Sequence, residues 1–151
     1  MEATRFALRR YRDDDEDAAI ELWRRTWQRT YPQIDFTARL PWWRERWRNE
    51  LVPVATITVG EGDGGLVGFV TVDEQTGYLD QLVVAPEAWG SPLAALLLGE
   101  AKRMAPAVLD LEVNTDNARA VRFYQKHGFI VTGGSVNRRS GAPLFIMRWR
   151  P

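Results

Sequence analysis

The side chains of this sequence that are suited to chemistry and lie at helical spacing gather in one short stretch, Asn117–Phe129. It holds an amide at Asn117, a phenol at Tyr124 and the only imidazole of the chain at His127. A phenol can donate a proton through a single hydrogen bond. Because the chain has no cysteine and only this one histidine, we expect no thiol nucleophile, no disulfide and no metal centre.

The element that positions these side chains is a capped helix that runs into a strand. Asp116 or Asn117 can accept hydrogen bonds from the first turn. Lys126 and His127 stand in the last turn, where cations suit the helix dipole. Gly128 supplies a left-handed cap, and a strand begins in 129–132. One apolar face runs along the helix and contains Ala120, Val121, Phe123 and Tyr124. By this pattern alone, Tyr124 is equally well explained as a core aromatic.

The residues of this stretch also form the motif Asn-x-x-Ala-x-x-Phe-Tyr-x-Lys-x-Gly-Phe. It resembles the C-terminal signature of the GCN5-related N-acetyltransferase (GNAT) family. The resemblance implies an N-acetyltransferase that uses acetyl-CoA. In that family the asparagine contacts coenzyme A and the tyrosine lies beside its sulfur. It therefore implies that Asn117 binds the cofactor, and that Tyr124 lies at the cofactor and acts as the catalytic acid.

The predicted elements follow one another in the GNAT order, β-α-α-β-β-β-α-β-α-β-β. Strands are predicted in 5–8, 54–59, 66–72, 77–84, 108–114, from 129 onward and in 143–149, and helices in 13–31, 35–51, 92–104 and 117–127. Pro41 predicts that the second helix is kinked or divided. The fold class is α/β: one domain over 1–151, with a mixed, mostly antiparallel sheet between helices. Because a helix connects strands 79–84 and 108–114, we expect these strands to be parallel neighbours that part at one end.

The resemblance implies that the segment Trp89–Ala94 holds the cofactor pyrophosphate. The family has Gln/Arg-x-x-Gly-x-Gly/Ala here, whereas this chain has Trp89 and Pro92. Proline has no N–H, and one lost hydrogen bond to a charged group costs roughly 1.5–3 kcal/mol. We expect Trp89 to cover an apolar part of the cofactor and backbone N–H groups to bind phosphate, those of Gly90, Ser91, Leu93 and Ala94.

The strand 79–84 is implied to bind the rest of the cofactor through the backbone of Leu82, Val83 and Val84. The N–H of Leu82 or Val83 is the expected donor to the thioester carbonyl. Strand alternation predicts Asp80 and Leu82 on one face of the sheet. Asp80 is the predicted catalytic base, with Glu112 or a water molecule as alternatives.

Two conspicuous patterns are interpreted as structural. The run 60–65 spells G-x-G-x-x-G, but it leads into a strand, so we predict a β-hairpin and no dinucleotide site. The acidic run 13–17 is interpreted as the solvated first turn of a helix. Aromatic stripes at Trp23, Trp27 and Tyr31 and at Trp43 and Trp47 are interpreted as core, with an acceptor pocket as the alternative.

Twenty basic and twenty acidic side chains give zero net charge, which argues against nucleic acid or an anionic membrane as partner. No apolar run approaches the roughly 20 residues that span a bilayer. We expect a cytoplasmic monomer or homodimer that acetylates a small-molecule amine. The alternative is a divergent GNAT-fold module that binds a ligand, or serves a structural role, with weak or no catalysis.

Overall fold

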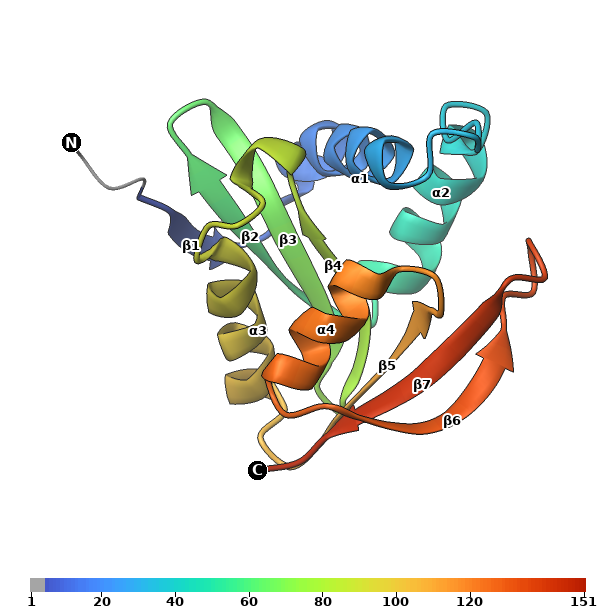
Figure 1. Cartoon of the computed structure of the whole chain (residues 1–151). Coiled ribbons are helices and arrows are strands. Elements are labelled where there is room, and N and C mark those ends of the chain that lie inside the picture. The colour runs from blue at the N-terminus through green and yellow to red at the C-terminus, as the bar shows by residue number, and fades with distance from the viewer. Residues whose placement is uncertain (1–4) are drawn as a thin grey trace.

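The structure is a computed structural model that describes residues 5–151. Within this range, seven strands form one sheet in the order β1-β2-β3-β4-β5-β7-β6 (Figure 1). The strands are β1 (Ala7–Arg10), β2 (Thr56–Gly62), β3 (Gly65–Asp73), β4 (Tyr78–Val84), β5 (Leu109–Asn114), β6 (Ile130–Val136) and β7 (Pro143–Trp149). All neighbouring pairs are antiparallel except β4 and β5, which are parallel. The predicted mixed sheet with one parallel pair is therefore confirmed.

Helices cover both faces of this sheet. The longer ones are α1 (Glu16–Thr30), α2 (Leu40–Arg46), α3 (Leu93–Met104) and α4 (Ala118–Lys126), and the short turns are η1 (Asp13–Asp15), η2 (Trp47–Leu51) and η3 (Pro86–Ala88). Helices α1 and α2 pack on one face, whereas α3 and α4 pack on the other. No helix in residues 5–151 is long and apolar enough to cross a membrane.

The aromatic residues of the N-terminal helices form the core under α1 and α2. Trp23 and Trp43 stack with ring centroids 4.4 Å apart, and Trp47 is completely buried against Phe69 of β3. Such stacked and edge-on pairs add to the free energy of burial. The interpretation of these three tryptophans as core is confirmed, and they do not line an acceptor pocket.

The second predicted helix begins later than expected. Pro41 lies in the first turn of α2, where its missing N–H costs no helical hydrogen bond. Asp35 caps the preceding turn instead, since its carboxylate accepts the N–H of Ala38 (3.1 Å). After Arg46 the chain continues as the single π-helical turn η2.

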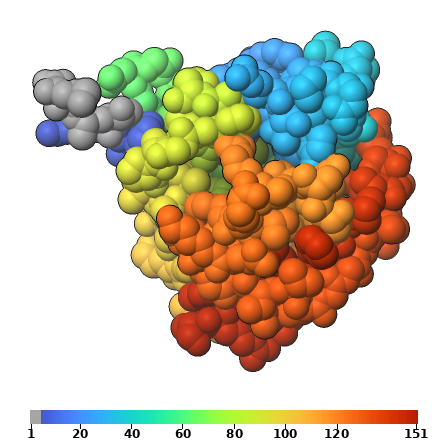
Figure 2. All heavy atoms as spheres, viewed as in Figure 1, coloured from blue at the N-terminus to red at the C-terminus, as the bar shows by residue number. Residues whose placement is uncertain are grey.

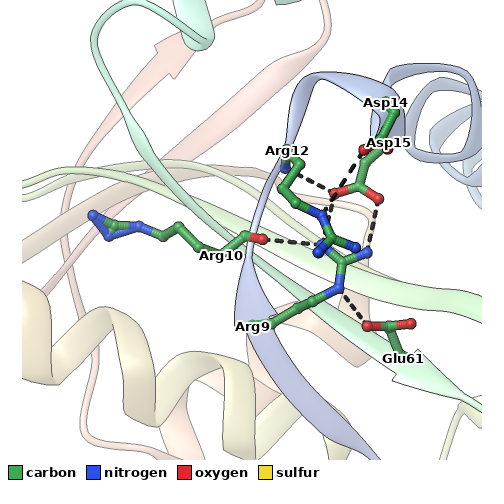
Figure 3. Close-up of polar contacts among 6 residues, drawn as sticks. All are labelled: Arg9, Arg10, Arg12, Asp14, Asp15 and Glu61. Atoms are coloured by element: carbon green, nitrogen blue, oxygen red, sulfur yellow. Dashed lines mark hydrogen bonds and ion pairs between the residues drawn. The ribbon is translucent and has the colours of Figure 1, made fainter.

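The interpretation of the acidic run 13–17 as the solvated first turn of a helix is wrong for Asp15 (Figure 3). Asp15 is buried. Its carboxylate accepts hydrogen bonds from the backbone N–H of Arg12 and from both terminal nitrogens of the Arg9 guanidinium, each at 2.8 Å. Arg9 also pairs with Glu61 in the β2–β3 hairpin. The Arg9 guanidinium holds the pKa of Asp15 below its usual value. This cluster fastens β1 and α1 to the hairpin, which is where the G-x-G-x-x-G pattern lies, as predicted.

The parallel pair β4–β5 is joined only at its beginning. Tyr78 and Asp110 are its single register pair, and the N–H of Asp110 donates to the carbonyl of Gly77 (2.9 Å). Gly77 has φ +79°, and a Cβ there would lie 2.2 Å from the carbonyl oxygen of Val108. Only glycine allows this approach. From this point the two strands diverge (Figure 1), so the predicted opening is confirmed.

A β-bulge at Asp80 changes which residues of β4 face α3 and α4. Thr71 of β3 pairs with Gln81, but the next residue, Val72, pairs with Leu79, so Asp80 is the extra residue. As a result Leu79 and Leu82 both pack in the core under α3 and α4. The predicted simple alternation of β4 is therefore wrong, and Asp80 and Leu82 do not share a face.

Candidate active site

Along the opening between β4 and β5, the backbone N–H and C=O groups that point from one strand toward the other form no hydrogen bonds between the two strands. The N–H of Ala85 donates to Val67 of β3 (2.8 Å). Since successive backbone groups of a strand alternate between its two sides, those of Val83 also point toward β3, and those of Leu82 and Val84 point toward β5. Of the two expected donors to the thioester carbonyl, the register therefore favours Leu82.

Helix α4 packs across this opening and carries Tyr124. Tyr124 is buried in the same cluster as Leu79 of β4 and Val113 of β5. Burial alone raises the pKa of its phenol above the usual value of 10.0. The hydroxyl therefore stays protonated at neutral pH, as a proton donor must.

Asn117 serves as the N-cap of α4, as predicted. Its side-chain oxygen accepts the N–H of Ala120 at 3.4 Å. The helix thus uses one lone pair of this oxygen. The predicted contact of Asn117 with coenzyme A remains a prediction.

The loop from Trp89 to Ala94 offers fewer free N–H groups than expected. Helix α3 begins at Leu93, one residue later than predicted. The N–H of Ser91 donates to the carbonyl of Ala88 (3.1 Å), and that of Leu93 donates to the hydroxyl of Ser91 (3.3 Å). Pro92 has no N–H. The N–H groups left free for a phosphate in this loop are therefore mainly those of Gly90 and Ala94.

Trp89 lies at the edge of the opening. Its indole N–H donates to the carbonyl of Val84 (2.8 Å), which faces away from β3. The guanidinium of Arg119, from the first turn of α4, lies over the indole with its carbon 3.6 Å from the ring centroid. Figure 2 shows the surface of the loop before α3 meeting that of the α4 segment, with a recess beside the contact. That Trp89 covers the cofactor remains a prediction, and in this structure its indole contacts Arg119.

That recess is a hollow of about 310 Å³ between the end of α1 and the start of α4. Its walls include Arg29, Tyr31, Trp89, Asn117 and Arg119. The phenol of Tyr31 donates to the carboxylate of Asp116 (2.8 Å), so α1 is tied to the loop before α4. Burial, followed by this carboxylate, raises the pKa of Tyr31 to about 12.

The carboxylates lie on the other face of the sheet, toward α2. Both oxygens of Asp80 accept hydrogen bonds from the guanidinium of Arg46, at 2.8 and 2.6 Å. Glu112 alternates with buried residues of β5 and is exposed, and no cation of residues 5–151 pairs with it. Burial, together with the charges of Asp80 and Glu112, raises the pKa of Tyr78 to about 12. The guanidinium of Arg46 lies among these three side chains, and we call the group of Tyr78, Asp80 and Glu112 the acidic patch.

His127 does not act as a capping cation, contrary to expectation. Burial and the neighbouring charges of Lys102 and Lys126 lower its pKa, so its imidazole is neutral at pH 7. The cations at the end of α4 are Lys126 in its last turn and Lys102 of α3, whose ammonium donates to the carbonyl of His127 (2.8 Å).

Comparison with known proteins decides the family. The model of the Acetyltransferase (GNAT) family matches residues 16–129. This chain belongs to the GNAT family. It is 31% identical to the peptidyl-lysine N-acetyltransferase YjaB of Salmonella typhimurium, over 93% of this chain and 94% of that protein. It is also 30% identical to the peptidyl-lysine N-acetyltransferase YiaC of Escherichia coli, over 87% of this chain and 88% of that protein.

Solved GNAT structures share the fold. The solution structure of apo YjaB from Escherichia coli superposes with a TM-score of 0.78 at 27% identity, covering 96% of this chain and 97% of that one. The PaiA N-acetyltransferase of Thermoplasma acidophilum, crystallised with coenzyme A, gives 0.80 at 21% identity, with coverage of 97% and 99%. The GNAT chain described here is an acetyltransferase, and its cofactor is acetyl-CoA.

The residues of this GNAT site fit the thioester end of acetyl-CoA better than its phosphate end. The opening, the backbone of Leu82 and the protonated Tyr124 suit an acyl thioester. The phosphate loop is poorer in donors, as the sequence predicted from Pro92. Sequence reasoning missed Arg46 and Arg119. Each meets its partner across more than 25 residues of sequence, and neither belongs to a local motif.

Proposed function

We propose that this chain transfers the acetyl group of acetyl-CoA directly to the side-chain amine of a lysine in a protein or peptide. The observation that carries the transfer is the parallel pair β4–β5, which is joined at one register pair and then open, with Tyr124 buried in the same hydrophobic cluster as residues of both strands. An opening through the sheet lets two substrates meet from opposite faces. The α3/α4 face carries the expected cofactor groups, and the α2 face carries the acidic patch.

The chain's own groups supply the polar part of this chemistry. Acetyl-CoA provides an activated acyl carbon and a thiolate leaving group. The N–H of Leu82 is aimed into the opening, where it stabilises negative charge on the acyl oxygen. The phenol of Tyr124 gives its proton to the departing sulfur. With no cysteine in the chain, a thioester on the protein is excluded, which supports direct attack.

A carboxylate of the acidic patch takes the proton of the attacking amine. Asp80 and Glu112 are the candidates, and their surroundings differ. Asp80 is engaged by the guanidinium of Arg46 through both oxygens, whereas Glu112 is exposed and has no cation paired with it among the described residues. We propose Asp80 as the base, as the sequence predicted. Glu112 is the alternative, and its exposed position without a paired cation favours it. The patch also attracts the lysine ammonium.

Glu112→Gln and Asp80→Asn separate these two carboxylates. Loss of the base lowers kcat and removes the acidic limb of the pH–rate profile. Loss of a merely structural ion pair lowers stability and leaves the shape of that profile unchanged. The variant that abolishes the acidic limb identifies the base, and an intact limb in both variants would point to water.

The choice of lysine over a small molecule follows from two observations. The relatives named above, at 30 and 31% identity, are peptidyl-lysine N-acetyltransferases. In addition, Trp23, Trp43 and Trp47, which could have lined a small-molecule pocket, are buried in the core. A small aliphatic amine, the acceptor expected from the sequence, is the second candidate, because it presents the same ammonium to the acidic patch.

A matched acceptor panel tests the proposal. One lysine peptide, the same peptide with norleucine in place of lysine, and a series of free aliphatic amines are compared by thiol release, with mass spectrometry of the product. We expect release with the lysine peptide and none with the norleucine peptide. Turnover of free amines alone would replace lysine by the second candidate, and no turnover with any amine would contradict both.

A further inference from the structure

Arg119 is held in an unusual position for an exposed arginine. Its guanidinium carbon is 3.6 Å from the centroid of the Trp89 indole, and the indole is itself fixed by its hydrogen bond to Val84. No carboxylate among residues 5–151 lies within ion-pair distance of this guanidinium. Burial of part of the side chain lowers the pKa of Arg119, and no nearby acid opposes this shift. The guanidinium is therefore partly desolvated without a counter-charge.

Stacking on an indole leaves the binding edge of a guanidinium free. The cation–π contact uses the flat face, while the N–H groups point outward from its edge in a planar fork. This fork matches two oxygens of a phosphate group. The indole thus orients Arg119 without occupying its hydrogen-bond donors.

Arg119 lies beside a loop that has few free N–H groups to bind a phosphate. Trp89 begins the loop that leads to α3, and the N–H groups of Ser91 and Leu93 are already bonded within it. Pro92 has none. The hollow beside the stack is also walled by Arg29 and Asp116, so a second guanidinium faces the same space. The one carboxylate there, that of Asp116, accepts the hydrogen bond of Tyr31.

We propose that Arg119, oriented by Trp89, binds a phosphate group of acetyl-CoA and supplies the positive charge that the loop before α3 lacks. This inference rests on the proposed function, because acetyl-CoA must be the cofactor. It makes Arg119 a binding residue of the site and Trp89 its positioning residue. Trp89 then replaces the usual polar residue of the loop by holding a cation from a different helix.

Calorimetry with Arg119→Met and its matched control Arg122→Met tests the inference. Arg122 is an exposed arginine one turn further along α4. Three ligands are compared: CoA, dephospho-CoA, which lacks the ribose phosphate, and pantetheine, which lacks all phosphates. We expect Arg119→Met to weaken CoA binding about ten- to a hundred-fold, Arg122→Met to leave it nearly unchanged, and pantetheine to bind both variants as it binds the wild type.

The ligand series also locates the phosphate. An equal loss for CoA and dephospho-CoA assigns Arg119 to the pyrophosphate, and a loss for CoA alone assigns it to the ribose phosphate. Increasing salt should weaken CoA binding more for the wild type than for Arg119→Met. Melting temperatures without ligand confirm that both variants remain folded.

Three results would overturn the inference. The first is that Arg119→Met binds CoA like the wild type, and the second is that both arginine variants lose affinity equally. The third is a loss that extends to pantetheine, which would mean that Arg119 only shapes the loop. In each of these cases a wild type that binds CoA leaves the proposed function intact. A wild type that binds no CoA would overturn the proposed function and this inference together.

Discussion

Tyr124 is a core position that we also propose as a catalytic one. Its ring packs edge-on against Phe123 and Phe129 at centroid distances of 5.4 and 5.3 Å. The same burial that makes it a core aromatic raises its pKa, which keeps the proton on the oxygen. The sequence could not separate these two roles, and the buried position of Tyr124 in this structure is compatible with both.

We predict that Tyr124→Phe lowers kcat by about 10²–10⁴. The melting temperature and the affinity for CoA should change little, because the ring remains and a proton delivered in the transition state is not a ground-state contact. Steady-state kinetics, calorimetry and a thermal melt measure the three quantities.

Tyr11→Phe is the control for that substitution, and it should behave in the opposite way. Its hydroxyl accepts the indole N–H of Trp47 (3.0 Å) in the core under α1 and α2. Loss of this bond should cost about 0.5–1.5 kcal/mol of stability and leave kcat unchanged. Normal turnover of Tyr124→Phe together with a lower melting temperature would make Tyr124 a core residue only.

We predict that His127 makes the stability of this chain depend on pH near neutrality. Its folded-state pKa lies below the usual 6.5, so the unfolded chain takes up the proton first as the pH falls. The wild type should therefore lose stability between about pH 7.5 and pH 5.5, and His127→Gln should lose less. Denaturant unfolding at the two pH values measures the difference. An equal loss in both proteins would show that His127 does not carry the effect.

At the scale of the elements, local patterns predicted most of the fold. The N-cap at Asn117, the left-handed Gly128 and the hairpin at 60–65 depend on neighbouring residues, and each was predicted correctly. The bulge at Asp80 was not, because it is set by pairing with Thr71 and Val72 of another strand. The contacts Arg46–Asp80 and Arg119–Trp89 escaped prediction for the same reason. Candidate site residues could be named from a motif, but their partners depend on tertiary packing.

The closed end of the opening depends on Gly77, and we predict that Gly77→Ala destabilises the fold by about 1–3 kcal/mol or more. A Cβ there would collide with the carbonyl of Val108, and φ +79° is unfavourable for alanine. Gly99→Ala in α3 is the control, since a Cβ there meets nothing within 4 Å. It should stabilise the protein by about 0.5–1 kcal/mol through helix propensity. Denaturant unfolding measures both. A neutral Gly77→Ala would show that the parallel pair is not fastened there.

On the scale of the whole molecule, one sheet separates two cores that have different tasks. The core under α3 and α4 holds Tyr124 and borders the cofactor groups, and the core under α1 and α2 supports Arg46 and the acidic patch. The hydrogen bond between Tyr31 and Asp116 links the two halves beside the opening. The net charge is zero, yet Asp80 and Glu112 lie with Arg46 on the proposed acceptor side, and Arg29 and Arg119 lie with Asp116 beside the loop before α3. The distribution of charge, more than its sum, suits a reaction between an ammonium and a phosphate-bearing cofactor.

Initial-rate kinetics test the central claim most directly, which is that acetyl passes straight from acetyl-CoA to an amine across the β4–β5 opening. Thiol release is measured while acetyl-CoA and the lysine peptide are varied together, and the protein is examined by mass spectrometry after incubation with acetyl-CoA alone. Direct attack predicts intersecting double-reciprocal lines, one acetyl-lysine formed for each thiol released, and no acetyl group on the protein. Parallel lines together with an acetylated protein would contradict it.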